Sequence, residues 1–143
     1  MIINTDASSA QILVPILLHI LWVCGLYILL VRRKTAAVKA GGVDLRRTAI
    51  DVSAWPDSVR LVSNNISNNF EAPVLFYAAC IATYLLGAAG SLAVGLAYVF
   101  VISRAVHSWV HVNSNTVPVR MKAFAVGLLC ILVLVVQTLI HLL

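Results

Sequence analysis

The sequence predicts an all-α integral membrane protein, built as an up-down bundle of four helices in a single domain over residues 1–143. Three observations support this class. Hydrophobic residues make up 62% of the chain and charged residues only 10%, whereas soluble domains carry about 25% charged residues. The apolar residues form runs of about 20, the length that crosses a bilayer. The charged residues fall between these runs or at their ends.

The first helix is expected at about residues 10–33. Residues 12–31 contain no charged side chain, and the basic run at 32–34 is expected to end the helix. His19 lies inside this segment, where a neutral histidine bonded to a neighbouring helix is the expected role; a ligand or relay role stays open. No basic stretch precedes the apolar run, unlike in a cleaved signal peptide, so the helix is expected in the mature protein.

The second helix is expected at about residues 57–87, after a polar, irregular loop over residues 34–57. At 1.5 Å per residue it would be about 45 Å long, so its polar first half should extend beyond the hydrocarbon. Pro73 removes a helical hydrogen bond and predicts a kink. A short uncharged turn leads to the third helix at about 91–113, and the fourth is expected at about 119–142.

The basic residues predict the orientation in the membrane. An excess of lysine and arginine marks the cytoplasmic side, and all ten fall on one side of the four-helix topology, at positions 32, 33, 34, 39, 46, 47, 60, 104, 120 and 122. Both termini are therefore expected outside the cytoplasm. The net charge of +5 is interpreted as this topology signal, because no aromatic residues accompany the charges as in a nucleic-acid site.

Several other classes of function lack support in the sequence. Cys24, Cys80 and Cys130 lie inside apolar runs, and their odd number and spacing predict neither a disulfide framework nor a zinc site. No glycine-rich phosphate loop, Ser-His-Asp set or HExxH motif is present, so hydrolase and nucleotide chemistry is not indicated.

Polar residues gather near the predicted cytoplasmic ends of the helices. Helical spacing places Arg60, Asn64, Ser67, Asn68 and Glu71 on one face of the second helix. A buried amide without a partner costs about 2–7 kcal/mol, so this face must contact protein or water rather than lipid. The candidate site combines residues of this face with residues of the other helices. Its members are Arg32, Arg33, Asn64, Asn68, Glu71, Arg104, His107, His111 and Arg120.

This set suits a polar, anionic or zwitterionic ligand. Arginine binds carboxylates with a planar fork, and asparagine and glutamate can hold amide and ammonium groups. The apolar helix faces above could receive a lipophilic second substrate. In the alternative interpretation the polar residues only hold helices together, at about 0.6–2 kcal/mol per hydrogen bond.

The motifs resemble those of the membrane-associated proteins in eicosanoid and glutathione metabolism (MAPEG), the family of the microsomal glutathione transferases. Their second helix carries Arg-x-x-x-Asn-x-x-Glu followed by proline, and the run NNFEAPVLFY at 68–77 looks like a common bacterial version. In the third helix, Arg104, His107 and His111 resemble an Arg-x-x-His-x-x-x-Tyr pattern. Arg120 follows at the position of the family's thiol-activating arginine. The pair at 32–33 resembles the basic pair that closes the family's first helix.

The resemblance implies a homotrimer that binds glutathione as co-substrate between subunits. It assigns thiolate stabilisation to Arg120 and the peptide to Asn68 and Glu71. Two positions depart from the pattern, because Asn64 replaces an arginine and His111 replaces an aromatic hydroxyl. The remaining candidates, Arg32 or Arg33 with His107, are implied to contact the glutathione carboxylates.

Three functional hypotheses follow. The first is a glutathione-dependent transferase or peroxidase acting on lipophilic electrophiles or lipid hydroperoxides. The second is a non-catalytic lipid-binding or scaffold protein of the same family, and the third is a small proton-coupled transporter using Glu71. In each case the chain is expected to be a multi-pass protein of a bacterial inner membrane, with the lipid bilayer as a partner and no metal or nucleic acid.

Overall fold

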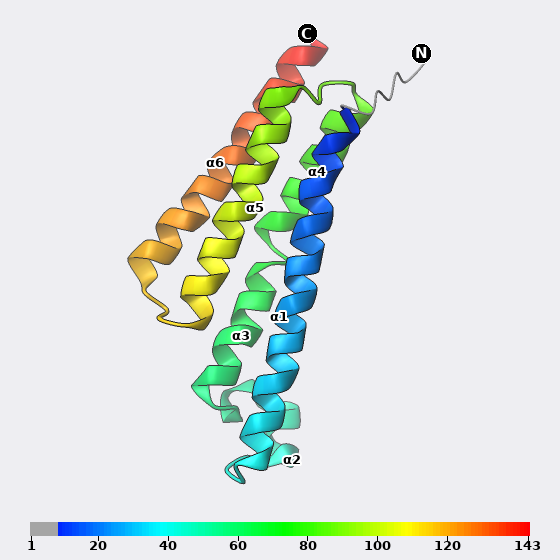
Figure 1. Cartoon of the computed structure of the whole chain (residues 1–143). Coiled ribbons are helices and arrows are strands. Elements are labelled where there is room, and N and C mark those ends of the chain that lie inside the picture. The colour runs from blue at the N-terminus through cyan, green and yellow to red at the C-terminus, as the bar shows by residue number, and fades with distance from the viewer. Residues whose placement is uncertain (1–8) are drawn as a thin grey trace.

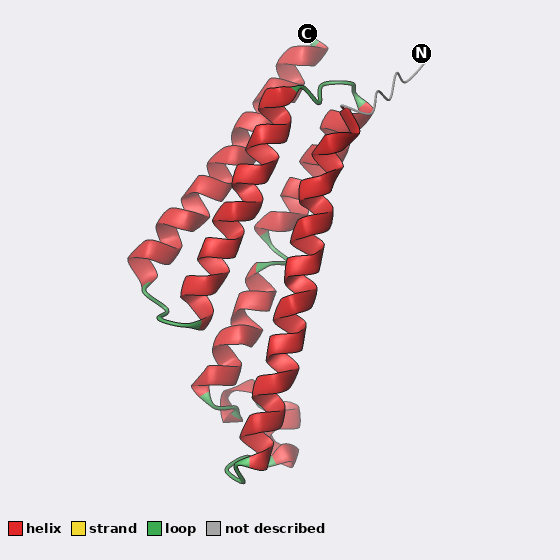
Figure 2. Ribbon diagram, in the orientation of Figure 1, coloured by secondary structure: helices red, strands yellow, loops and turns green. Residues whose placement is uncertain are grey.

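The computed structural model describes residues 9–143, and this part of the chain contains helices and no strand (Figures 1 and 2). The predicted all-α class is confirmed. In chain order the elements are η1 (Ser9–Ile12), α1 (Leu13–Lys39), α2 (Leu45–Ile50), η2 (Val52–Ala54), α3 (Asp57–Asn68), α4 (Ala72–Leu85), α5 (Ser91–Val112) and α6 (Val117–Leu142).

The first helix is longer than expected. α1 continues through the basic run at 32–34 and reaches Lys39, so the prediction that the helix ends at about residue 33 was wrong. The basic residues end the apolar segment, but arginine, lysine and alanine are good helix formers. The helix stops where Gly41 adopts a left-handed φ of 78°, a conformation that glycine accepts at a helix end.

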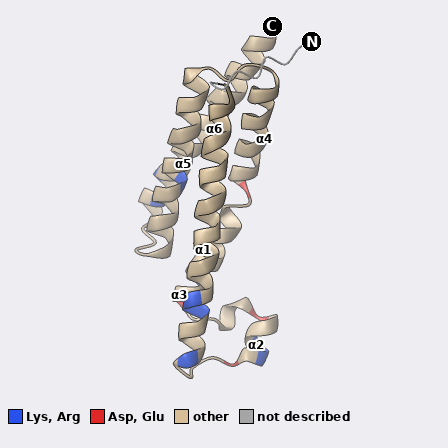
Figure 3. Cartoon of the chain, turned by 45° about the vertical axis from the view of Figure 1, so that its right-hand side comes forward, with Lys and Arg blue, Asp and Glu red and all other residues tan. Residues whose placement is uncertain are grey.

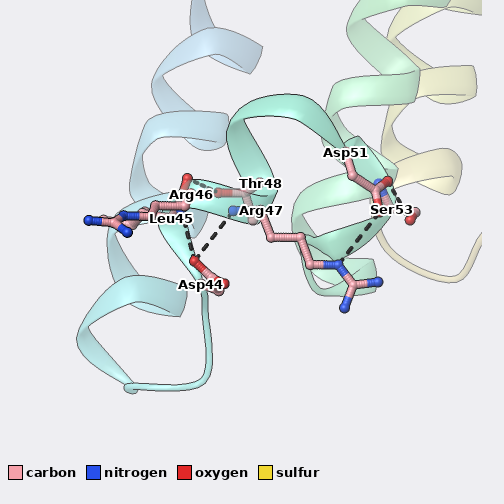
Figure 4. Close-up of polar contacts among 7 residues, drawn as sticks. All are labelled: Asp44, Leu45, Arg46, Arg47, Thr48, Asp51 and Ser53. Carbon is pink, nitrogen blue, oxygen red and sulfur yellow. Dashed lines mark hydrogen bonds and ion pairs between the residues drawn. The ribbon is translucent and has the colours of Figure 1, made fainter.

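The segment expected as an irregular loop contains α2 and η2, and that expectation was wrong. Asp44 caps α2, because its Oδ1 accepts hydrogen bonds from the backbone N–H groups of Arg46 and Arg47 at 2.9 and 3.3 Å (Figure 4). Asp51 starts η2 and accepts from the hydroxyl and the backbone N–H of Ser53. These two bonds, the hydroxyl first, hold the pKa of the Asp51 carboxyl below its ordinary value.

The expected second helix over residues 57–87 is split into α3 and α4, which lie end to end beside α1 (Figure 1). Pro73 is one of the first two residues of α4. It has no N–H to donate to the carbonyl of Asn69, and its ring would collide with that carbonyl in a continuous helix. The predicted kink is therefore a complete break at residues 69–71, which releases the carbonyl end of α3.

Apolar packing joins the helices on the side of the C-terminus. Phe76 of α4 stacks on Phe100 of α5 with ring centroids 4.0 Å apart. α5 and α6 approach closely at Gly127, where an added Cβ would lie 2.9 Å from Ser103 Oγ. Small residues at such crossings allow the van der Waals contact that drives helix association in lipid. A second apolar cluster, nearer the other end, joins α1, α3 and α5 through Leu26, Val62, Ile66 and Val112.

Within residues 9–143, three segments are long and apolar enough to cross a membrane: Ser9–Lys39, Ser91–Val112 and Val117–Leu142. Their outer faces carry large apolar side chains, such as Leu17, Leu132 and Ile140, that are 59–67% exposed. Lipid contact suits these faces, so the protein is a multi-pass integral membrane protein. α3 and α4 are each too short to span alone, so no single continuous helix makes the expected fourth crossing.

Charged residues concentrate toward one end of the molecule (Figure 3). Lysines and arginines lie on the lower parts of α1, α5 and α6 and around α2 and α3, whereas the end that carries the C-terminus and the α4–α5 turn has none in the described residues. We refer to these as the basic end and the apolar end. The expected location of the N-terminus outside the cytoplasm concerns residues 1–8, which lie outside the described part of the chain.

Candidate functional site

A buried polar cluster lies between α3 and α5 toward the basic end. Its members are at most 4% exposed, although the helices that carry them are otherwise apolar at these depths. We define the buried polar cluster as Asn65, Asn69, Arg104, His107, Ser108 and His111. Polar groups so far from water are retained when they bind each other or a ligand.

Two asparagines connect α3 to α5. Asn65 Nδ2 lies 3.3 Å from His111 Nδ1, at hydrogen-bond distance. Asn69 Nδ2 donates to the backbone carbonyl of Asn65 at 2.8 Å and is 3.4 Å from Ser108 Oγ. Asn69 Oδ1 is buried without a hydrogen-bond partner among the described residues. The cluster is therefore ordered, yet it retains acceptor capacity.

Arg104 is the most deeply buried cation of the site, with 1% of its surface exposed. Its Nη2 donates at 3.0 Å to the carbonyl of Asn68, which the break after α3 leaves without a helical donor. The guanidinium lies 5.9 Å from the ring centroid of Phe124. Its Nε and Nη1 atoms are buried with no partner in residues 9–143. Arg104 thus holds the end of α3 and keeps two unused donors for an anionic acceptor.

Arg120 lies at the start of α6, where two contacts position it. Its Nη1 donates to Asn115 Oδ1 at 2.7 Å, and its backbone carbonyl accepts from His107 Nδ1 at 3.0 Å. Asn115 adopts a left-handed φ of 48° in the α5–α6 loop, which asparagine tolerates better than most residues. His107 therefore connects Arg120 to the buried polar cluster.

An open polar groove of about 360 Å³ lies between α3 and the α5–α6 loop. Asn64 and Arg60 contribute from α3, and Asn115 contributes from the loop. Arg120 does not line the groove itself, but it donates a hydrogen bond to Asn115, which does. This polar groove is reachable from the basic end, whereas the neighbouring cluster is enclosed.

Asn64, Asn68 and Glu71 do not join the cluster. Asn64 and Glu71 are exposed and Asn68 is half-buried, and Glu71 forms no ion pair within the described residues. The single polar face expected from residue 60 to residue 71 is interrupted, because the helix breaks before Glu71. Of these three residues, Asn68 contacts the cluster through its backbone carbonyl, which accepts a hydrogen bond from Arg104.

The two arginines at the end of the apolar part of α1 have different environments. Arg33 donates to the carbonyls of Ser58 at 2.7 Å and Val112 at 3.1 Å, so it joins α1 to α3 and α5. Arg32 is exposed and lines a shallow groove on the outer surface of α1 with Lys39. Within one chain, the structure does not bring Arg32 to the other predicted site residues.

Sequence reasoning missed Asn65, Asn69 and Ser108 as site residues. A signal was available, because Asn65 lies between the apolar residues Val62 and Ile66, which form the buried face of α3. Asn65 lies three residues after Val62 and Asn69 lies three residues after Ile66, so helical spacing places both asparagines on the buried face. The neighbouring residues Asn64 and Asn68, which were predicted instead, lie on the more exposed side of the helix.

His19 has the structural contact expected for it. It is fully buried, and its Nδ1 lies 2.6 Å from the hydroxyl of Tyr77 on α4. His19 Nε2 has no partner among the described residues. The pair joins α1 to α4 within the apolar part of the bundle.

The chemistry of the site favours an organic anion over a metal ion. No group of three or more His, Cys, Asp or Glu side chains in residues 9–143 could hold a metal. The available groups are mainly donors, namely the guanidinium groups of Arg104 and Arg120 and the amides around them. Such donors bind carboxylates and stabilise thiolates.

The fold and the site together define a multi-helix membrane protein with a buried cluster of arginine, asparagine and histidine toward one end of the bundle. The chain matches the family model of the MAPEG family over residues 12–140. It therefore belongs to the MAPEG family, as the motif resemblance predicted. No curated protein and no solved structure matches the chain.

Proposed function

We propose that this protein is a membrane-embedded, glutathione-dependent transferase or peroxidase acting on lipophilic electrophiles or lipid hydroperoxides. One observation carries the proposal: the buried guanidinium of Arg104 has two unpaired donor atoms immediately beside Asn68. A cation with unused donors in a low-dielectric interior strongly favours an anionic partner. Membership of the MAPEG family makes glutathione the first anion to test.

Glutathione has the functional groups that this region can bind. Its two carboxylates suit Arg104 and the basic rim of the polar groove, and its ammonium group suits the exposed carboxylate of Glu71. Asn64 and Asn68 offer amide donors and acceptors for the peptide groups.

Arg120 is proposed to stabilise the thiolate. A free thiol has a pKa near 8.5, so only a few per cent is ionised at neutral pH. Lowering that pKa by about two units requires about 2.7 kcal/mol of differential stabilisation. Arg120 uses one donor atom on Asn115, and the rest of its five-donor guanidinium stays available to a ligand.

The thiolate would then react with the lipophilic partner. In a transfer to an activated alkene, the sulfur attacks the electrophilic carbon, the C–S bond forms as the π bond breaks, and the resulting carbanion takes up a proton. In a substitution, the C–S bond forms as the bond to the leaving group breaks, and the leaving group departs with the electron pair. In peroxide reduction, the sulfur attacks the distal oxygen, the O–O bond breaks and the alkoxide takes up a proton. A second glutathione converts the resulting sulfenic acid into the disulfide and water.

The same proposal includes an assembly of at least two copies, with the family's homotrimer as the expected state. In a single chain the carboxylate of Glu71 is exposed at the α3–α4 break, within an otherwise apolar helical layer, and lipid contact there would be costly. A neighbouring copy would cover it. We also propose that α3 and α4 together make the fourth crossing, with both termini on the side away from the basic residues.

The proposal is tested by calorimetric titration of glutathione into detergent-purified protein while thiolate absorbance is followed. Wild type is expected to show saturable binding with a thiolate signal, and Arg120→Ala is expected to lose that signal. Arg46→Ala is the matched control, because Arg46 is exposed on α2, outside the site. Absence of saturable binding at millimolar glutathione in the wild type refutes the proposal.

A non-catalytic lipid-binding role is the second candidate. It is favoured by Asn64 in place of the family arginine and by His111 in place of the aromatic hydroxyl. In that case the wild type does not bind glutathione, and Asn64→Arg is expected to create binding. Wild-type turnover that Arg120→Ala abolishes excludes this role.

A further inference from the structure

Large apolar side chains lie exposed on the segment between α1 and α3. Ile50 is 90% exposed, and Leu45 and Val52 are 57% and 60% exposed. α2 packs inward through Thr48, which is buried, so the other three side chains are left on the outside. Clustered apolar residues of this kind mark a surface that contacts protein or membrane. We refer to residues 43–55 as the α2–η2 segment.

This segment lies near the plane where the bilayer ends. The uncharged stretch of α1 ends at Val31, and α1 continues for eight residues to Lys39, about 12 Å along the helix axis. The head-group layer on each side of the hydrocarbon is about 5–8 Å thick, so the end of α1 lies beyond it. The turn after α1 is the outermost tip of the basic end, and the chain then comes back through α2 and η2 toward the start of α3 (Figure 1). The returning chain therefore passes into the head-group layer.

Two contacts fix the level at which the segment ends. Lys34 Nζ lies 4.9 Å from the ring centroid of Trp55, the residue after η2. Arg33 donates to the carbonyl of Ser58 at 2.7 Å, next to the start of α3. Both basic residues lie within about 5 Å of Val31 along the helix axis. Trp55 is thus held at the level of the head groups, where tryptophan is enriched in membrane proteins.

Positive charge surrounds the apolar side chains. Residues 32–54 contain six basic and two acidic side chains. Asp44 caps α2 and Asp51 lies 3.8 Å from Arg47, so both acidic groups are engaged within the segment. The side chain of Arg46 forms no hydrogen bond or ion pair within residues 9–143, and it extends away from Asp51 (Figure 4). An exposed cation beside exposed apolar groups is typical of a helix that lies in the interface of an anionic membrane.

We propose that the α2–η2 segment lies in the head-group layer of an anionic leaflet and anchors the basic end of the bundle to the membrane surface. Ile50 and Val52 enter the boundary of the acyl chains, and Arg46 binds a lipid phosphate. An anionic leaflet is favoured over a zwitterionic one, because each basic residue near a negatively charged surface strengthens binding. The segment leads into Asp57, which lines the polar groove, so the anchor holds one wall of that groove at the membrane surface. This binding does not depend on the proposed glutathione chemistry.

Spin labelling in nanodiscs measures the depth of the segment. Full-length protein with Ile50→Cys receives a nitroxide label in a Cys24→Ala background, because Cys24 is exposed whereas Cys80 and Cys130 are buried. Collisions with oxygen report lipid, and collisions with a water-soluble nickel complex report water. In phosphatidylglycerol nanodiscs, the ratio of oxygen to nickel collisions should be at least about threefold higher at position 50 than in Gly42→Cys. Gly42 lies in the connection from α1 to α2, where an added Cβ meets no atom within 4 Å.

Two charge variants test the anionic head group. Arg46→Gln is expected to lower the population of the inserted segment about fivefold in phosphatidylglycerol, because it removes one cation at the surface. Lys122→Gln is the matched control, since Lys122 is exposed on α6 outside the segment, and it should leave the label at position 50 unchanged. Phosphatidylcholine nanodiscs should cause at least the loss seen in Arg46→Gln. Unchanged helical circular dichroism establishes that the variants fold.

Four outcomes overturn the proposal. Equal nickel accessibility at positions 50 and 42 in phosphatidylglycerol places the segment in water. Equal depth in the two lipids removes the role of the anionic head group, and wild-type depth in Arg46→Gln removes the phosphate contact. Dipolar broadening between labels at position 50, lost when unlabelled protein is added, shows that a second copy of the chain covers the segment instead.

Discussion

Replacing Arg104 with methionine should reduce anion binding while leaving the fold nearly as stable as before. Arg104 is 1% exposed and makes one hydrogen bond, from Nη2 to the carbonyl of Asn68. Its Nε and Nη1 atoms are buried and unpaired within residues 9–143. A residue that only held helices together would not be expected to leave two buried donors unused.

The size of each effect follows from these contacts. Removing the guanidinium forfeits one hydrogen bond, worth about 1 kcal/mol, but it also removes a buried cation whose donors are unpaired. Apolar replacement of buried charges is often neutral or stabilising, so the net change in the free energy of unfolding should stay within about 1 kcal/mol. A ligand carboxylate would lose a charge-assisted bond worth about 1.5–3 kcal/mol, which raises Kd by roughly 10- to 150-fold.

Calorimetric binding of glutathione and thermal unfolding in detergent measure the two quantities separately. Arg104→Lys keeps the charge and should recover part of the affinity, and Arg46→Met on the exposed surface of α2 should leave both quantities unchanged. The reasoning is refuted if Arg104→Met unfolds several degrees earlier and still binds glutathione with wild-type affinity. That result would make Arg104 a packing residue that closes the end of α3.

Three further predictions concern the scaffold. Gly127→Ala should destabilise the α5–α6 contact by about 1–3 kcal/mol, since the new Cβ would lie 2.9 Å from Ser103 Oγ. Thermal unfolding measures this loss of stability. Adding Ser103→Ala to Gly127→Ala should restore part of it. Thr83→Val and Thr138→Val should each lower the free energy of unfolding by about 0.6–2 kcal/mol, because the two hydroxyl oxygens lie 2.7 Å apart. If the hydrogen bond between them dominates, the double variant is expected to be no less stable than either single variant. NMR titration should show a pKa for the Asp51 carboxyl below its ordinary value of 3.8, because Ser53 donates two hydrogen bonds to it. These bonds stabilise the turn at any pH above the pKa of Asp51 in the unfolded chain. The stabilisation is lost as the pH falls through the lower pKa of Asp51 in the folded protein.

The sequence located the membrane helices well but not all of their ends. Hydropathy detects where the apolar segment stops, so it placed the end of the first helix near residue 33, whereas the backbone continues to Lys39. Hydropathy is also insensitive to caps such as Asp44, which starts α2 by binding two backbone N–H groups. Pro73 was recognised as a disturbance, but whether a proline kinks or breaks a helix depends on what can satisfy the freed carbonyl groups.

The candidate site shows the same limit. Arg104, His107 and His111 were placed on one face by their spacing, and the structure buries all three. Asn65 and Asn69, which complete the cluster, were passed over in favour of Asn64 and Asn68. Neighbouring asparagines differ by only about 100° around a helix, and the sequence does not say which of them faces the next helix.

Composition, charge placement and motifs were enough to predict a helical membrane protein of the MAPEG family whose basic residues gather at one end. These properties depend on local composition and on helical period, which need no partner to be evaluated. The packing of the helices adds that Arg104 binds the end of a broken helix, that Arg33 joins three helices, and that a groove opens beside Gly25. Such contacts link residues far apart in the chain, and they form only after packing has selected which face of each helix points inward.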